Sequence, residues 1–129
     1  MENITNEDRM DALRAISSMI GKTEKAKEKF QQGTAPHTLE SNRLKALLIA
    51  SSLISNELEG SPCAGCHTQE ELKKALAPIA SLISKSEKAL TKLAHGTWQH
   101  TMLSDYLKAL RIASQLLGKA LNEATAGQT

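Results

Sequence analysis

The chain has 129 residues, a length that fits one domain with a single modest core. Hydrophobic residues make up 40% of the sequence, which excludes a wholly disordered chain. Aromatic residues make up only 2%, which argues against a β-sandwich and against a nucleic-acid surface built on base stacking. The 16 basic and 14 acidic residues leave a net charge of +2, too balanced to predict binding to a polyanion.

Most of the chain consists of two copies of one unit. Residues 5–58 align with residues 68–121 without a gap, and 26 of the 54 aligned positions are identical. Self-similarity at a fixed offset indicates a tandem duplication of one structural unit. We therefore predict a single domain over residues 1–129, with repeat one at 5–58, a connection at 59–67, repeat two at 68–121 and a C-terminal tail at 122–129.

Each unit is predicted to be a helical hairpin. In repeat one Thr5 is the predicted N-cap of the first helix, Gly33 ends that helix and Thr34 caps the second. The equivalent residues of repeat two are Thr68, Gly96 and Thr97. Apolar residues recur in each helix at spacings of three and four, which is typical of a bundle seam. Among them, in chain order, are Leu13, Ile16, Ile20 and Phe30; Leu44, Leu47, Ile54 and Leu58; Leu76, Ile79, Ile83 and Leu93; and Leu107, Leu110, Leu117 and Leu121.

A lone hairpin cannot cover its apolar stripe, but two copies in one chain can cover each other. The predicted fold is therefore all-α, an antiparallel up-and-down four-helix bundle with pseudo-two-fold symmetry. Small residues in the second and fourth helices, Ala46, Ala50, Ala109 and Ala113, should let these helices approach their neighbours closely. In such a bundle the connection at 59–67 lies at the same end as the two termini.

One motif with chemistry lies in that connection, the sequence Cys63-Ala-Gly-Cys66-His67. It resembles the haem-attachment site of c-type cytochromes. The resemblance covers these five residues. It implies that the two thiols bond to the vinyl groups of one haem and that the His67 imidazole reaches the iron. Met10 or Met1, a water, or no group at all would then occupy the second axial position.

Two other interpretations of the motif stay open. Cys63, Cys66 and His67 could hold zinc, with a fourth ligand from Glu59, Glu70, Glu71 or a second molecule, or the thiols could be a redox pair. Alternatively, the segment is a Gly-Ser-Pro loop with two incidental thiols.

Three further histidines are weaker candidates for a metal or anion site. His37 and His100 occupy equivalent positions in the two repeats, and His95 lies just before the second of them. We expect all three at the end of the bundle opposite the connection, with His37 and His100 near each other. The alternative is a duplicated histidine that stays solvated.

No acid–base pair or nucleophile–base arrangement is apparent, so a non-enzymatic protein is expected. The first hypothesis is a binding, interaction or regulatory module that uses its helical faces for a protein partner or for self-association. The second is a small c-type haem protein for electron transfer or sensing. The longest apolar stretch, residues 46–54, is too short for a membrane span, and no secretory signal is apparent. We expect a cytoplasmic protein that binds neither nucleic acid nor membrane, or a periplasmic one if a leader has been removed and haem c is attached.

Overall fold

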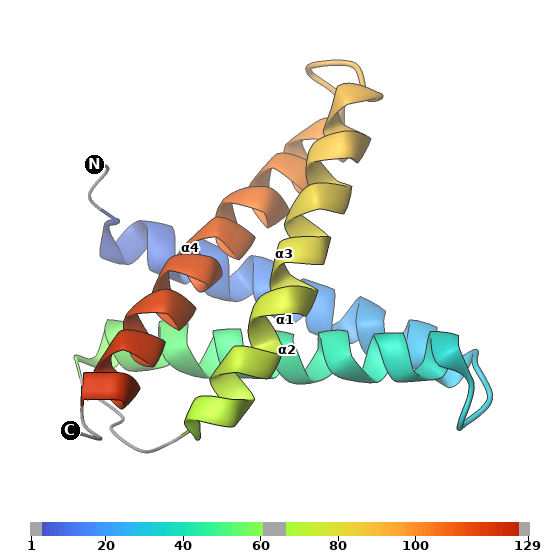
Figure 1. Ribbon diagram of the computed structural model, residues 1–129. Coiled ribbons are helices and arrows are strands. Elements are labelled where there is room, and N and C mark those ends of the chain that lie inside the picture. The colour runs from blue at the N-terminus through green and yellow to red at the C-terminus, as the bar shows by residue number, and fades with distance from the viewer. Residues whose placement is uncertain (1–3, 61–66, 127–129) are drawn as a thin grey trace.

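The computed structural model describes residues 4–60 and 67–126. This part of the chain forms four helices and no strand: α1 (Asn6–Glu28), α2 (Ala35–Glu59), α3 (Gln69–Thr91) and α4 (Trp98–Ala126). The prediction of an all-α four-helix bundle is confirmed. Figure 1 shows that α2 returns alongside α1, that α4 returns alongside α3, and that the two hairpins cross at a steep angle.

The N-caps that the sequence predicts are present. The Thr5 hydroxyl accepts a hydrogen bond from the Asp8 backbone N–H at 3.0 Å, and the Asp8 carboxylate accepts one from the Thr5 N–H at 3.1 Å. Thr68 and Glu71 form the same reciprocal capping box at the start of α3. The Thr34 hydroxyl accepts the first-turn N–H of α2. Each cap satisfies backbone donors that have no partner inside their helix.

The first helix of each hairpin ends before the glycine that the sequence predicts as its end. Helix α1 ends at Glu28, and Gly33 lies four residues beyond its C-cap Lys29, in the connection to α2. Gly33 has a positive φ of 86° and Gly96 of 89°. These glycines therefore take the left-handed conformation that only glycine adopts at little cost, but in the turn before the next N-cap instead of at the helix end.

The hairpins pack against each other at the middle of the crossing. Helix α4 packs across α1 and α2, α3 packs on α2, and α1 and α3 do not touch within the described residues. Alanines 46, 50, 109 and 113 are at most 1% exposed, which agrees with the close helix approach that the sequence predicts. The largest fully buried side chains of the described residues are Ile16, Leu47, Ile54, Ile79, Leu110 and Leu117.

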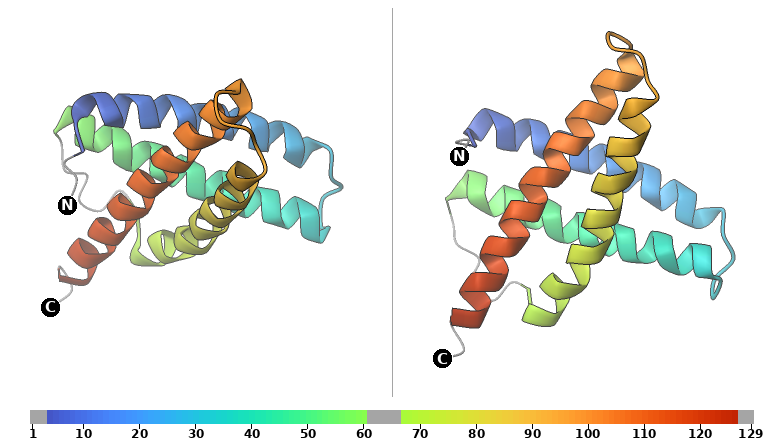
Figure 2. Two further views of the ribbon diagram at one scale, coloured as in Figure 1. Left: turned by 90° about the horizontal axis from the view of Figure 1, so that it is seen from above. Right: turned by 45° about the horizontal axis from the view of Figure 1, so that its top comes forward.

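Away from this crossing the hairpins project from the core. We call the projecting end of each hairpin its tip. The α1–α2 tip comprises residues 20–42 and the α3–α4 tip comprises residues 80–106, and neither range includes a buried side chain. The spacing placed Phe30 and Leu76 on the apolar seam, but the structure leaves both partly exposed. Phe30, two residues past the end of α1, is 40% exposed, and Leu76 is 37% exposed although Leu72, Ala75 and Ile79 of the same helix are buried. Figures 1 and 2 place the two tips at separate corners of the molecule.

Burial at the crossing predicts a sharp difference between two neighbouring leucines of α2. Leu47 is fully buried, whereas Leu48 is 50% exposed. Replacing Leu47 by alanine leaves a cavity and should lower the free energy of unfolding by about 2–5 kcal/mol. Leu48→Ala removes the same atoms but should lower the free energy of unfolding by no more than about 0.5 kcal/mol. Urea unfolding followed by circular dichroism measures both, and equal losses would contradict this core.

Candidate functional site

Only part of the Cys63-Ala-Gly-Cys66-His67 motif can be placed. Cys63 and Cys66 lie outside the described residues, and His67 immediately precedes the N-cap of α3. The His67 ring is half-buried, and its Nε2 lies 3.2 Å from the Ser52 hydroxyl of α2. The imidazole therefore rests against the body of the bundle. Ligation through Nε2 would require this nitrogen to leave Ser52.

The side chains proposed to complete a haem or zinc site at this motif are either exposed or bonded to other groups. Met10, the candidate second axial ligand, is 49% exposed in α1. Glu70 forms an ion pair with Lys74 at 3.1 Å, and Glu71 holds the capping box of α3. The two hydrogen bonds with Thr68 lower the pKa of the Glu71 carboxyl. Glu59, at the end of α2, is exposed. Of the three carboxylates, Glu71 has the clearest structural role already.

The three weaker histidine candidates do not form one site. His95 and His100 lie together at the α3–α4 tip, with ring centroids 4.5 Å apart. His37 lies at the other tip, so the expectation that it would be near His100 is wrong. The physical reason is the crossing of the hairpins, which carries equivalent ends of the two repeats to different corners (Figure 2).

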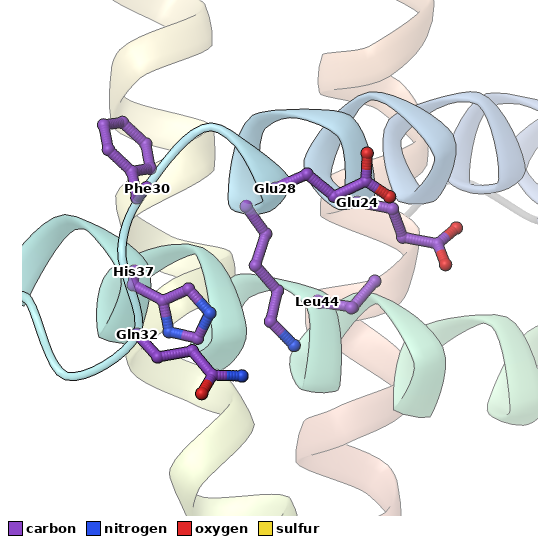
Figure 3. Close-up of a pocket in the computed structure, with 7 residues that line it drawn as sticks. Glu24, Glu28, Phe30, Gln32, His37 and Leu44 are labelled. Atoms are coloured by element: carbon purple, nitrogen blue, oxygen red, sulfur yellow. The ribbon is translucent and has the colours of Figure 1, made fainter.

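A shallow pocket surrounds His37 at the α1–α2 tip. Its volume is about 350 Å³, and it lies between the last turns of α1 and the first turns of α2. Figure 3 shows the His37 ring beside the Gln32 side chain, with Phe30 further along the connection and Glu24 and Glu28 on α1. In this view the two carboxylates lie toward α1 and away from the imidazole.

A larger depression, which we call the α1–α4 groove, lies where α4 crosses α1. It has a volume of about 550 Å³. Its floor is apolar, formed by Ala12, Ala15, Ala109 and Ile112. Its rim carries three acidic and three basic side chains, namely Asp8, Asp11, Asp105, Arg14, Lys22 and Lys108. Sequence reasoning did not single out this groove, because only the crossing brings the two rows of residues together.

Tyr106 of α4 links the two walls of the groove. Its hydroxyl lies 2.7 Å from the Ser18 hydroxyl of α1. The Lys22 ammonium lies 4.9 Å from the centroid of the Tyr106 ring and donates to the Met102 sulfur at 3.4 Å. A cation over an aromatic face is an attractive arrangement. These contacts hold the end of the groove nearest the α3–α4 tip.

The repeats differ at this position, which is the signal that could have identified Tyr106. The equivalent residue of repeat one is Arg43, which is buried and bonds to Glu40 at 3.0 Å. The one tyrosine of the chain thus replaces a buried arginine. The two copies of this position have therefore diverged, because Tyr106 bonds across to α1 whereas Arg43 bonds within α2.

Ion pairs occupy the charged rim. Lys108 donates to the Asp8 carboxylate at 3.0 Å, and Arg14 to Asp11 at 3.4 Å. The backbone hydrogen bond from Thr5, followed by the bond from Lys108, lowers the pKa of the Asp8 carboxyl. Asp8 is therefore held as an anion that caps α1 and borders the groove.

This lowered pKa predicts how acid weakens the fold. The Asp8 contribution to stability is fully present above the pKa of the unfolded chain, near 3.8, and is lost as the pH falls through the lower pKa of the folded state. The Asp8→Asn variant lacks this charge, so its thermal midpoint should drop less between pH 7 and acidic pH than that of the wild type. Asp11→Asn is the matched control, because Asp11 pairs with Arg14 but caps no helix. Equal acid sensitivity of wild type and Asp8→Asn would contradict this role.

Comparison with protein-family models, curated proteins and solved structures finds no match to this chain. Within residues 4–60 and 67–126, no group of three or more histidine, cysteine or acidic side chains is placed to hold a metal ion. No helix in the same part of the chain is long and apolar enough to cross a membrane.

Proposed function

We propose that this protein is a non-enzymatic binding module that holds an amphipathic helix of a protein partner in the α1–α4 groove. The observation that carries the proposal is the make-up of the groove, an apolar floor surrounded by charges of both signs. Protein interfaces have this anatomy, with an apolar centre and a polar rim. Helix-in-groove recognition uses it to seat the apolar face of a helix.

The floor suits apolar side chains of a partner. Ala12, Ala15 and Ala109 lie at the bottom of the groove, where at most 8% of each residue is exposed, and the groove as a whole has a volume of about 550 Å³. This volume is within the range of roughly 300–1,000 Å³ that is usual for binding pockets. Tyr106 stands at the side of this space, and tyrosine is among the residues enriched at the energetic centres of interfaces.

The rim suits the charged flanks of the same helix. The Arg14 and Asp11 side chains are 75% and 61% exposed, and the Lys108 side chain is 65% exposed. Exposed ion pairs of this kind contribute little to folding, typically about 0–1 kcal/mol. They can therefore exchange their partners for charges on an incoming helix without loss of the fold. Alternating charges also select a register, which a uniformly charged rim would not do.

Photo-crosslinking tests this proposal. A benzophenone amino acid at Asp105, on the rim, should yield one discrete adduct in the native host. Arg14→Glu should reduce the adduct, whereas Lys74→Glu should leave it unchanged. Lys74 is the matched control because its side chain is 76% exposed, like that of Arg14, and also pairs with an acidic neighbour on its own helix.

Three outcomes would overturn the proposal. The first is the absence of any adduct, and the second is an adduct that Arg14→Glu and Lys74→Glu affect equally. The third is an adduct that contains only a second copy of this chain, which would make the groove a site of self-association. Mass spectrometry of the adduct distinguishes the third outcome from the expected one.

A second candidate function rests on the Cys63-Ala-Gly-Cys66-His67 motif, which matches a haem c attachment site at all its defining positions. In this function Cys63 and Cys66 would bind the haem covalently and His67 would be an axial ligand. The Ser52 hydroxyl, 3.2 Å from His67 Nε2, would then lose its imidazole partner. Zinc held by the same three side chains is the other form of this candidate.

An absorption spectrum and metal analysis of protein purified from its native host without chelator test this candidate. If haem is attached, a Soret band survives acid–acetone extraction and is lost in Cys63→Ser and Cys66→Ser. If zinc is bound, the protein contains about one zinc per chain or per dimer, and the same substitutions release it. Protein with neither group would exclude both forms and leave the thiol pair without a cofactor.

A further inference from the structure

The α3–α4 tip holds two imidazole rings against each other. The centroids of the His95 and His100 rings are 4.5 Å apart, and the ring planes are tilted by 47°. His95 is exposed and His100 is half-buried. Trp98, the only tryptophan of the chain, lies between them in sequence and is 70% exposed.

The backbone that carries the two rings is tightly bonded. The Thr97 N–H and hydroxyl donate to the Ala94 carbonyl at 3.4 and 2.8 Å. The Thr97 hydroxyl in turn accepts the His100 N–H at 3.2 Å. Gly96 completes the turn with a φ of 89°, a conformation that other residues rarely adopt. The backbone that carries the two histidines is therefore held by the turn and the N-cap of α4.

The distance between the two ring centroids fits two ligands of one metal ion. Neutral imidazole is a common ligand of Zn²⁺, Cu²⁺ and Ni²⁺. Two imidazoles that share an ion at metal–nitrogen distances of about 2.0–2.1 Å, at neighbouring coordination positions, have ring centroids roughly 4.5–5 Å apart. We propose that His95 and His100 form a two-histidine site for a divalent transition-metal ion, with the remaining coordination positions open to water or to an added ligand.

The position of the tip agrees with such a site. Residues 80–106 include no buried side chain, so an ion reaches the imidazoles without any opening of the core. The site is independent of the α1–α4 groove, whose lining contains neither histidine. It also differs from the position of His67, which immediately precedes the N-cap of α3 at the other end of the α3–α4 hairpin.

Repeat one provides an internal comparison. Its tip has the same turn, because the Thr34 N–H and hydroxyl donate to the Gln31 carbonyl at 3.2 and 2.7 Å and Gly33 has a φ of 86°. His37 occupies the place of His100, but Gln32 occupies the place of His95. Figure 3 shows Gln32 beside His37. A neutral carboxamide is a poor ligand for these ions, so only the tip of repeat two has both donors.

Trp98 provides a local reporter for the test. Ni²⁺ bound beside the indole should quench its fluorescence, and a Ni²⁺ titration of the full chain at neutral pH should give saturable quenching. His95→Gln, which installs the repeat-one residue, should weaken the apparent affinity at least about tenfold, since even loss of an outer-shell partner typically costs roughly 10–100-fold. His37→Gln is the matched control and should leave the titration unchanged. Both substitutions lie outside the core, and circular dichroism checks that each variant is folded.

A gain-of-function variant tests the geometry directly. Moving the reporter with Trp98→Ala and Ala35→Trp should give a protein without strong quenching. Adding Gln32→His to this protein should restore saturable quenching, now at the tip of repeat one. Three results would overturn the proposal: no saturable quenching of the wild type, equal effects of His95→Gln and His37→Gln, or no response to Gln32→His.

Discussion

The burial of four alanine side chains on α2 and α4 is the constraint on which the rest of the structure depends. Ala46 and Ala50 of α2, with Ala109 and Ala113 of α4, are almost completely buried. A methyl group is the smallest side chain that still contributes apolar surface, so it allows two helix backbones to approach at an angle. Leu47, Ile54, Leu110 and Leu117 then pack around this point. The core is therefore concentrated where the hairpins cross.

Features outside the core follow from this geometry. Crossed hairpins diverge away from their contact, so the tips at residues 20–42 and 80–106 extend from the core without buried side chains. The same divergence opens the α1–α4 groove, whose floor includes one of these four alanines, Ala109. Binding surfaces can therefore change at the tips and at the rim of the groove while the core stays the same.

Two differences between the repeats lie at these surfaces. Tyr106 borders the groove where repeat one has the buried Arg43, and His95 meets His100 where repeat one has Gln32 beside His37. The core pair Leu47 and Leu110, the capping threonines and the turn glycines are retained at equivalent positions of the two copies. Identical positions support the same local structure twice, whereas the changed positions give each hairpin its own chemistry.

The sequence by itself determined the four helices, their N-caps and most of the core, because capping and apolar periodicity act over a few residues of one chain segment. The sequence also contains the Cys63-Ala-Gly-Cys66-His67 motif, which is the basis of the haem and zinc hypotheses. Its two cysteines lie outside the described residues. Only the tertiary structure decided the crossing of the hairpins, the separation of His37 from His100, and the groove around Tyr106. Apolar spacing shows which face of a helix is buried but not the angle at which two buried faces meet. That angle depends on how side chains far apart in the sequence fit together, and here small alanines on α2 and α4 lie at the contact.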